Sequence, residues 1–316
     1  MPSLTDIIKP ALRSRLRQSI PDFLPRRFDA NTAHQAAVWN AKTYQVDPRA
    51  HVFTTIQEHF GHRIIKSLSV PSGGVVVDIG CFIGEKLWQL DHRRPYLGVG
   101  VDIARSSLQA AQKIDIYNHK FIAADMEHLP FINRSVDLVL VFDVIEHLTH
   151  ADRGFAEIAR VLKPGGQLLL HIPVLDNTWS MFWWKQQLFP AAAQKDYADV
   201  GHTAQRMLTR DQIRCHLTRY GLTVEQAIPY NAFFVHFWDR EFAQATAWAL
   251  ARLFRRGQTT AAATRTVHTG RLGTLRTFYG RFLVPVLEIL SWPDWLLSRL
   301  GIGNTCFYLV RKITPG

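Results

Sequence analysis

The sequence predicts an α/β fold in which a mostly parallel sheet is covered by helices on both faces. The first indication is residues 75–79, where three consecutive valines are typical of a strand buried on both faces. The second is the turn that follows, which begins at Gly80 and opens into a helix near Glu85. The third is repetition, because two further apolar strands end at Asp102 and Asp125 and alternate with helical patterns.

The overall composition allows one large domain, or one domain with sizeable additions. The chain has 316 residues, of which 47% are apolar, so a substantial core can form. Its formal net charge of +11 indicates anionic partners such as nucleic acid, phosphates or a membrane surface. The cysteines form no C-x-x-C pair, so we expect neither a disulfide framework nor a zinc site, as in a reducing cytoplasm: Cys81, Cys215 and Cys306.

Neither a secretory signal nor a membrane-spanning helix is expected. Pro10 and several charged residues interrupt any apolar run before residue 30. A spanning helix needs about 20 consecutive apolar residues. The best candidate, residues 282–300, is interrupted by Pro285, Glu288, Pro293, Asp294 and Arg299. We therefore predict a cytoplasmic protein.

The turn after the first strand indicates which kind of ligand it would hold. A dinucleotide site uses the spacing G-x-G-x-x-G, whereas Gly80 and Gly84 are spaced G-x-x-x-G. Asp78 also places a negative charge where it would repel a pyrophosphate and attract a cationic amine. The stretch V-V-V-D-I-G-C-F-I-G resembles motif I of the class I S-adenosylmethionine (SAM) dependent methyltransferases. Phe82 departs from that motif, since the family usually has glycine there.

The remaining strands and helices follow in the order that this family would have. Strands are expected at 96–101, 120–125, 136–142, 167–172, 222–228 and 305–311, with helices at 106–113, 152–162 and 210–220. The segments D-V-I-E-H-L and V-L-K-P-G-G extend the resemblance over residues 75–173, in the manner of methyltransferase type 11/23 proteins and the ubiquinone-pathway O-methyltransferases. It implies a Rossmann-like, doubly wound sheet of seven strands whose last strand is antiparallel.

The resemblance also implies a SAM site along the ends of four strands. Asp102 lies at the distance from the glycine turn where an acid receives the ribose hydroxyls. Asp125 would accept a hydrogen bond from the adenine amino group. The full set of expected cofactor residues is Asp78, Gly80, Cys81, Gly84, Asp102, Ile103, Asp125, Met126, Phe142 and Asp143.

The end of the fourth strand would face the methyl group, so acid–base groups are expected there. On a helix, Asp143, Glu146 and His147 would share one face. His147 is the best candidate for a general base and Glu146 could orient it, although both could instead cap and pack the helix start. Together with His202, these residues are similar to the carboxylate–histidine metal site of two subfamilies, the ubiquinone-pathway O-methyltransferases and the small-RNA 2′-O-methyltransferases. We favour a metal-free site, in which His202 contacts substrate or has a structural role.

Additions are expected on both sides of this predicted domain. We divide the chain into an N-terminal helical segment or lid (1–68, with Trp39 and Tyr44), the SAM-binding domain (69–230), inserted amphipathic helices (231–303) and the final strand of the domain (304–316). Residues 1–30 form a basic amphipathic pattern that suits either a membrane surface or packing on the domain. The insertion has no acid between Phe242 and Leu287 but seven arginines: Arg252, Arg255, Arg256, Arg265, Arg271, Arg276 and Arg281. Such a stretch suits an anionic leaflet, a solvated loop or RNA.

The loop after the fifth strand, residues 177–189, is rich in aromatic side chains that could line an apolar pocket, seat in a membrane interface or pack on the insertion. The predicted function is SAM-dependent methyl transfer to a hydroxyl or carboxylate of an apolar or lipid-linked small molecule, reached at the inner face of a membrane. The alternatives are a nucleic-acid methyltransferase and a non-catalytic SAM-binding protein that recruits a partner.

Overall fold

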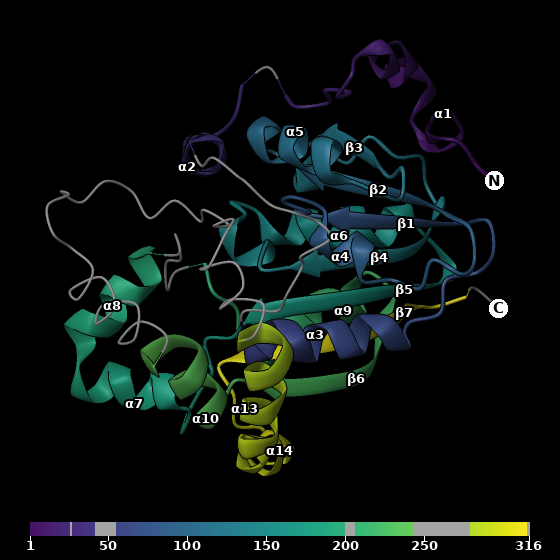
Figure 1. Cartoon of the computed structure of the whole chain (residues 1–316). Helices are drawn as coiled ribbons and strands as arrows, with labels where there is room; N and C mark the ends of the chain where they lie inside the picture. Colours follow the sequence, from purple (N-terminus) through teal and green to yellow (C-terminus); the bar gives the residue numbers. More distant parts are fainter. Residues whose placement is uncertain (26, 42–54, 200–205, 243–278, 315–316) are drawn as a thin grey trace, which may run out of the picture.

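The protein is built around one seven-stranded sheet, whose strands lie side by side from the top to the bottom of Figure 1. The computed structural model describes residues 1–25, 27–41, 55–199, 206–242 and 279–314. The strand order is β3-β2-β1-β4-β5-β7-β6, and β7 runs antiparallel to both of its neighbours. The strands are β1 (Gly74–Ile79), β2 (Tyr96–Asp102), β3 (Lys120–Ala123), β4 (Val136–Phe142), β5 (Leu162–Pro173), β6 (Leu222–Tyr230) and β7 (Thr305–Lys312). The predicted fold class is confirmed.

The strand order creates a switch point at the centre of the sheet. β1 pairs with β2 on one side and with β4 on the other, so Ile79 lies between Val101 and Val141. The chain moves outward in one direction through β2 and β3, and then in the other through β4 and β5. Ligands of such sheets bind in the crevice beyond the carboxyl ends of the strands at this point.

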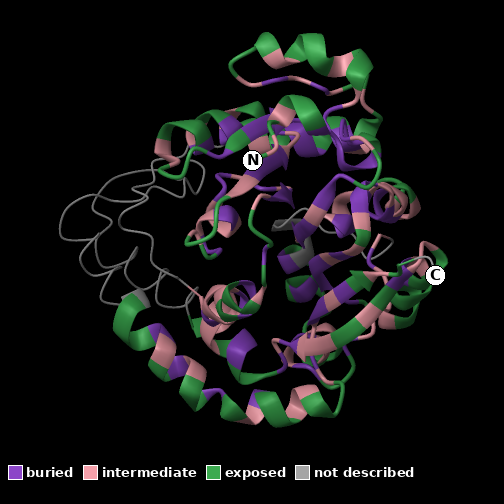
Figure 2. Ribbon diagram, turned by 90° about the vertical axis from the view of Figure 1, so that its right-hand side faces the viewer, coloured by how far each residue is buried: buried purple, intermediate pink, exposed green. Residues whose placement is uncertain are grey.

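Helices cover both faces of the sheet, and buried residues concentrate between the layers (Figure 2). One core packs Val75 and Val77 with α6 and α9, and the other packs Val76 with α3 and α5, as the alternation of side chains along a strand requires. The main helices are α2 (Ala30–Asn40), α3 (Ile56–Ser67), α4 (Glu85–Trp88), α5 (Arg105–Ile114), α6 (Ala151–Val161), α7 (Met181–Leu188), α8 (Pro190–Asp199) and α9 (Arg210–Arg219).

The N-terminal segment, residues 1–25, packs on the domain. It contains α1 (Leu4–Ile7) and the 3₁₀ helix η1 (Pro10–Arg17). Ile7 and Ile8 are buried in the core. Of the two alternatives for this segment, the structure therefore agrees with packing on the domain. Further along, Phe23 donates its N–H to the Ala123 carbonyl (2.7 Å) and so adds to the β3 edge of the sheet.

The described part of the insertion before β7 consists of short helical elements. It contains α10 (Phe234–His236), the π-helical turns η5 (Phe237–Phe242) and η6 (Tyr279–Leu283), α13 (Val284–Leu290) and α14 (Trp292–Arg299). Pro285 and Pro293 each lie in the first turn of a helix, where the missing N–H of proline costs no hydrogen bond. Residues 243–278 and six of the seven arginines lie outside the described residues, as do Tyr44 and His202. Among the described helices, none is long and apolar enough to cross a bilayer.

Candidate active site

A cavity of about 530 Å³ lies at the carboxyl edge of the sheet, at the switch point. One end is lined by residues that follow β1 and β2, including Gly80, Phe82, Asp102 and Ile103. A smaller cavity of about 70 Å³ shares Gly80, Asp102 and Ile103 and extends to Asp125 and Met126. We call this end of the large cavity, together with the smaller cavity, the cofactor end. The other end of the large cavity, the acceptor end, is lined by Pro173, Asn177, Phe182, Asp196, Met207, Asn231, His236, Asp239, Arg240, Asn304 and Thr305.

The turn after β1 adopts left-handed backbone at several positions. Gly80 has φ +70°, and a Cβ built on it would lie 2.3 Å from Cγ2 of Val144, so only glycine fits. Phe82 has φ +54°, the conformation that a glycine at this position would adopt without cost. Its ring lines the cavity and meets Trp39 edge-on, with ring centroids 5.8 Å apart. Phe82 therefore puts an aromatic wall where the family usually has none.

Asp102 ties the end of β2 to the turn after β1. Its carboxylate accepts a hydrogen bond from the Phe82 N–H and another from the Ala104 N–H, both at 2.8 Å. Burial raises the pKa of Asp102, and these backbone donors act against that shift by stabilising the charge. Since a carboxylate offers about four lone pairs, it can still accept the two hydroxyls of a ribose. Asp102 lines both cavities, as that role requires.

The smaller cavity is lined by the residues expected to hold the adenine. Asp125 is buried and lines this cavity together with Met126 and Ile103. One of its oxygens accepts the Glu127 N–H (2.9 Å), which fixes the carboxylate at the start of the 3₁₀ helix η3 (Met126–His128). A second acceptor atom remains for an exocyclic amine.

Asp78 lies in an environment that favours a cation. Its side chain is 1% exposed, and Oδ2 has no hydrogen-bond partner. Burial raises the pKa of Asp78 to about 8, although the charge of Lys86 acts in the opposite direction. Asp78 does not itself line the cavity, but Gly80, two residues on, does. A buried carboxylate with an unused oxygen fits the ammonium group of a SAM methionine tail.

Asp78 should make the ligand-free protein less stable as pH rises. Its pKa is about 8 in the folded protein against an ordinary value of 3.8, so the folded state holds more protons between these pH values. Stability should therefore fall as pH rises from about 4 to about 8 and be insensitive to this group above that range. Asp78→Asn should remove this fall, measured by urea unfolding at pH 5 and pH 8. An equal pH dependence in both proteins would contradict the assignment.

Cys81 and Gly84 support the turn from below. Neither lines the cavities. Cys81 is buried, burial raises its thiol pKa, and its sulfur would be 2.7 Å from a Cβ placed on Gly100. Gly84 caps α4 with φ +84° and leaves no room for a side chain beside Phe121. Both therefore shape the turn through packing.

The residues after β4 differ from the predicted arrangement. Asp143 has φ +54° and precedes a short 3₁₀ helix, η4 (Ile145–His147), so the prediction that Asp143, Glu146 and His147 share a helix face is wrong. A left-handed residue cannot continue a right-handed helix. Phe142, Asp143 and His147 line the large cavity. Glu146 is buried away from it, which fits the packing alternative.

His171 is a site residue that the sequence analysis missed. It lies on β5, is 1% exposed, and holds Nδ1 3.0 Å from the Asp143 carboxylate. The Asp143 N–H also donates to the His171 carbonyl (3.1 Å). The cavity carboxylate thus lies beside a buried imidazole. The available signal was a histidine within an otherwise apolar strand.

Of the acceptor end, the sequence analysis anticipated only the loop 177–189, from which Asn177 and Phe182 line the cavity; the other residues were missed, because they come from segments without a motif. His236 is buried and contacts the Asn304 amide at 3.2 Å (Nδ1 to Nδ2). The Asn231 amide donates to Gln57 (3.2 Å). Asp196 binds Lys185 (2.8 Å), whose ammonium also binds Glu241 (2.7 Å). These contacts join α3, α7, α8 and the insertion around one space.

Helix α2 closes the cavity from the N-terminal side. Asp29 caps it by accepting the Asn31 and Thr32 N–H groups (2.9 and 3.0 Å). The Asn31 side chain donates to the His147 carbonyl at 2.6 Å. Trp39, near the other end of α2, lines the cavity. The position is the one expected of a lid.

The described residues contain no group of three or more histidine, cysteine or carboxylate side chains arranged to hold a metal ion. His202 lies outside the described residues, so the four-residue set suggested by the sequence stays a prediction.

Comparisons with known proteins agree with this geometry. Residues 77–170 match the family model described as "Methyltransferase domain". Methyltransferase GfsG of Streptomyces halstedii is 28% identical over 126 residues, 38% of this chain and 45% of that protein. The ubiquinone/menaquinone biosynthesis C-methyltransferase UbiE of Brucella canis is 35% identical over 96 residues, 28% of this chain and 34% of that protein. The chain thus spans less than half the length of these relatives.

Solved structures show the same fold. A geranyl diphosphate C-methyltransferase from Streptomyces coelicolor A3(2), in complex with Mg²⁺, geranyl-S-thiolodiphosphate and S-adenosyl-L-homocysteine, superposes with a TM-score of 0.56 at 13% identity, covering 92% of this chain and 100% of that one. Phosphoethanolamine N-methyltransferase 2 of Haemonchus contortus, bound to SAM, gives 0.51 at 17% identity, covering 82% and 53%. The chain therefore has the fold of these methyltransferases, and its residues 77–170 match a methyltransferase domain, as the motifs predicted.

Proposed function

We propose that the protein is a SAM-dependent methyltransferase whose acceptor is a hydroxyl or carboxylate of an apolar small molecule. The observation that carries this is one continuous cavity, which joins the cofactor end at Gly80 and Asp102 to an acceptor end built largely from the additions to the fold. Methyl transfer requires donor and acceptor to meet in one water-excluding space. When bound, SAM supplies an electrophilic methyl group to the reaction.

The residues of the cofactor end would hold and orient that group. Asp102 would accept the ribose hydroxyls, Asp125 the adenine amine and Asp78 the ammonium of the methionine tail. The acceptor would then be positioned near Asp143 and His147, which line the cavity at the end of β4. His147 takes the proton from an acceptor hydroxyl.

The walls of the acceptor end favour a neutral hydroxyl on an apolar body. Phe182, Met207 and Pro173 supply apolar surface. Among the wall residues that the structure describes, Arg240 is the one lysine or arginine, and it is engaged by Asp196, whose carbonyl accepts from Nη2 (3.1 Å). A phosphorylated acceptor would need a cation without such a partner. The geranyl diphosphate C-methyltransferase that shares this fold therefore suggests an apolar acceptor for this protein, but not one that carries a diphosphate.

An apolar acceptor partitions into membranes, and we place the reaction at an anionic membrane face. Support comes from the large apolar side chains exposed on the elements around the acceptor end, among them Trp179, Phe189 and Phe233. A protein at the membrane face could take the apolar acceptor from the membrane without the acceptor passing through water.

The test is to supply tritiated methyl-SAM together with two fractions of the source cell, its organic-soluble extract and its total RNA. Label in the organic-soluble fraction supports the proposal. Label in RNA supports the nucleic-acid alternative, and SAM binding without labelling of either fraction supports a non-catalytic SAM-binding protein.

Replacing His147 should separate binding from turnover. His147→Ala is expected to lower kcat about 10²- to 10⁴-fold, the usual contribution of a positioned acid or base. SAM affinity, measured by calorimetry, should change only a few-fold. His150→Ala is the matched control, because His150 is exposed and lines neither cavity. Unchanged turnover in His147→Ala would remove the base assignment.

A further inference from the structure

Helices α13 and α14 carry an exposed apolar surface that we call the outer face. They project from the sheet at the bottom of Figure 1, beside α3 and β6. Ile289 is 71% exposed and Leu300 is 75% exposed. A single exposed apolar residue needs no explanation, but a contiguous group of them marks an interaction surface. The outer face comprises Phe282, Val286, Ile289, Leu290, Trp292, Trp295, Leu296 and Leu300.

The outer face is held rigidly on the domain by the opposite sides of the same helices. Val284 and Leu287 are buried in the core that includes α3. The stripe of exposed residues on α13 recurs at helical spacing, so these two helices are apolar on both sides. An apolar outer side has no role in the core of the described structure, because the inner side already supplies the packing.

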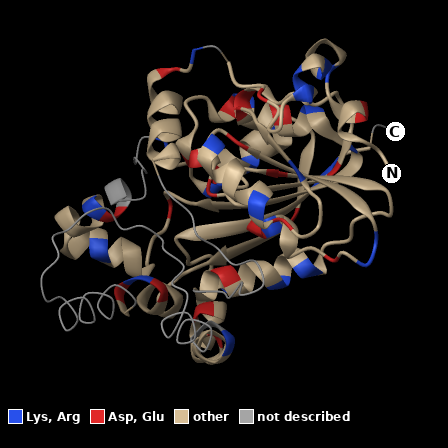
Figure 3. Ribbon diagram, turned by 45° about the horizontal axis from the view of Figure 1, so that its top comes forward, with Lys and Arg blue, Asp and Glu red and all other residues tan. Residues whose placement is uncertain are grey.

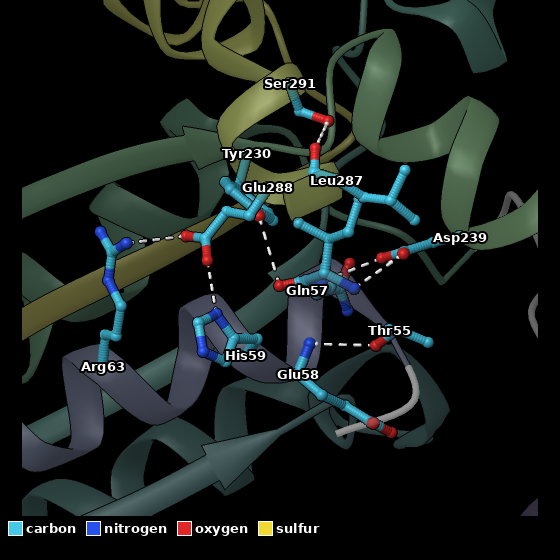
Figure 4. Close-up of polar contacts among 11 residues, drawn as sticks. Thr55, Gln57, Glu58, His59, Arg63, Tyr230, Asp239, Leu287, Glu288 and Ser291 are labelled. Atoms are coloured by element: carbon cyan, nitrogen blue, oxygen red, sulfur yellow. Dashed lines mark hydrogen bonds and ion pairs between the residues drawn. The ribbon is translucent and has the colours of Figure 1, made fainter. Parts of the chain in front are cut away.

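Both acids of these helices bind groups within the protein, and Figure 4 shows Glu288 directed toward His59 and Arg63. Glu288 contacts His59 and Arg63 on α3, the latter at 2.9 Å. Asp294 is buried, and its carboxylate accepts the N–H groups of Phe233, Phe234 and Val235 at 2.9 to 3.1 Å. The carboxylates that would repel an anionic surface are thus neutralised within the protein.

The cations of the same segment lie at the surface, and Figure 3 marks the lysines and arginines along the ribbon. Arg281 and Arg299 are exposed. The Arg299 guanidinium lies 3.8 Å from the centre of the Trp295 ring, which keeps the charge beside the apolar residues. Tryptophans next to arginines, with an apolar face between them, are typical of a helix lying in a membrane interface.

The outer face is also connected to the acceptor end of the cavity. Asp294 fixes the start of α10, where Phe233 and Phe234 are exposed. The same short helix carries His236, which lines the cavity, and Asn231 just before it does so too. A surface that holds α13 and α14 would therefore hold the insertion that forms the acceptor wall.

We propose that the outer face docks on an anionic lipid leaflet and lies in its interface without crossing it. The apolar residues enter the boundary between head groups and acyl chains, and Arg281 and Arg299 contact lipid phosphates. This inference rests on the proposed function in one respect: the docked protein would take its acceptor from the leaflet. Vesicle binding and SAM binding are measured separately, so either can fail alone.

The test is flotation of the full chain with vesicles of phosphatidylcholine alone or mixed with phosphatidylglycerol. The wild type should bind the anionic vesicles, and binding should weaken at high salt. The triple variant Ile289→Ser, Trp292→Ser, Trp295→Ser should bind at least about tenfold more weakly, since burial of apolar surface drives insertion. Arg281→Gln with Arg299→Gln should weaken binding to the anionic vesicles alone.

The matched control changes two equally exposed residues away from the outer face, Ile116→Ser with Ile313→Ser, and should leave flotation unchanged. Calorimetry with SAM shows that each variant is folded. Failure of the wild type to float, or equal flotation of the triple variant, overturns the proposal. So does a change of oligomeric state in the triple variant without a change in flotation, because a second copy of the chain would then be what covers this face.

Discussion

Replacing Asp102 with alanine is expected to weaken SAM binding by roughly a hundredfold or more. Each hydrogen bond to a charged group contributes about 1.5 to 3 kcal/mol, and a ribose would make two of them with this carboxylate. The change also removes the acceptors of the Phe82 and Ala104 N–H groups, which fix the turn after β1. Calorimetry with SAM measures the loss.

Asp91→Ala provides the control for this variant. Asp91 lies in the loop between α4 and β2, where its side chain binds the exposed Arg93, and it lines neither cavity of the site. Its removal should leave SAM affinity unchanged. Equal affinities for all three proteins would show that the cavity at the switch point is not the SAM site, and the proposed function would fall with it.

Gly80→Ala is expected to lower the free energy of unfolding by about 3 kcal/mol and to abolish SAM binding. A left-handed residue with a Cβ costs roughly 1 to 2 kcal/mol, and overpacking costs about 1 to 3 kcal/mol more. The overpacking arises because the new Cβ would lie 2.3 Å from Cγ2 of Val144. Urea unfolding and calorimetry measure the two effects.

Two further variants separate strain from crowding. Gly221 has φ +69° with nothing within 4 Å of an added Cβ, so Gly221→Ala should cost only about 1 kcal/mol. Adding Val144→Ala to Gly80→Ala removes the clashing methyl group and should restore part of the stability. If Gly80→Ala and Gly221→Ala lowered the free energy of unfolding equally, the close approach of the turn to Val144 would not contribute to stability.

The fold and most of the cofactor end could be predicted from local patterns. Valine runs predicted the buried strands, and β2 and β4 begin where the pattern placed them. Because parallel strands all present their carboxyl ends at one edge, acids that end β1, β2 and β3 must gather there. Asp102 and Asp125 accordingly line the two cavities. The position of Asp78, buried beneath the turn and outside the cavity lining, required the structure, because burial is not visible in a motif.

The residues around the methyl-transfer end could not be predicted in the same way. The spacing of Asp143, Glu146 and His147 suits a helix, but the left-handed backbone at Asp143 prevents one. The pairing of Asp143 with His171 depends on the register of β4 against β5, which places Phe142 beside His171. Register is decided by packing over the whole sheet.

The acceptor end depends still more on tertiary contacts. Asn177, Asn231 and Asn304 come from three separate segments and meet only because β6 and β7 return beside β5. The turn that opens at Gly80 was thus determined by the sequence alone, since glycine, acid and strand are neighbours in the chain. Tertiary structure alone decided what faces that turn, including the Phe82 ring, His171 and the amide-lined wall. Contacts between distant segments follow no local period, so no spacing in the sequence could predict them.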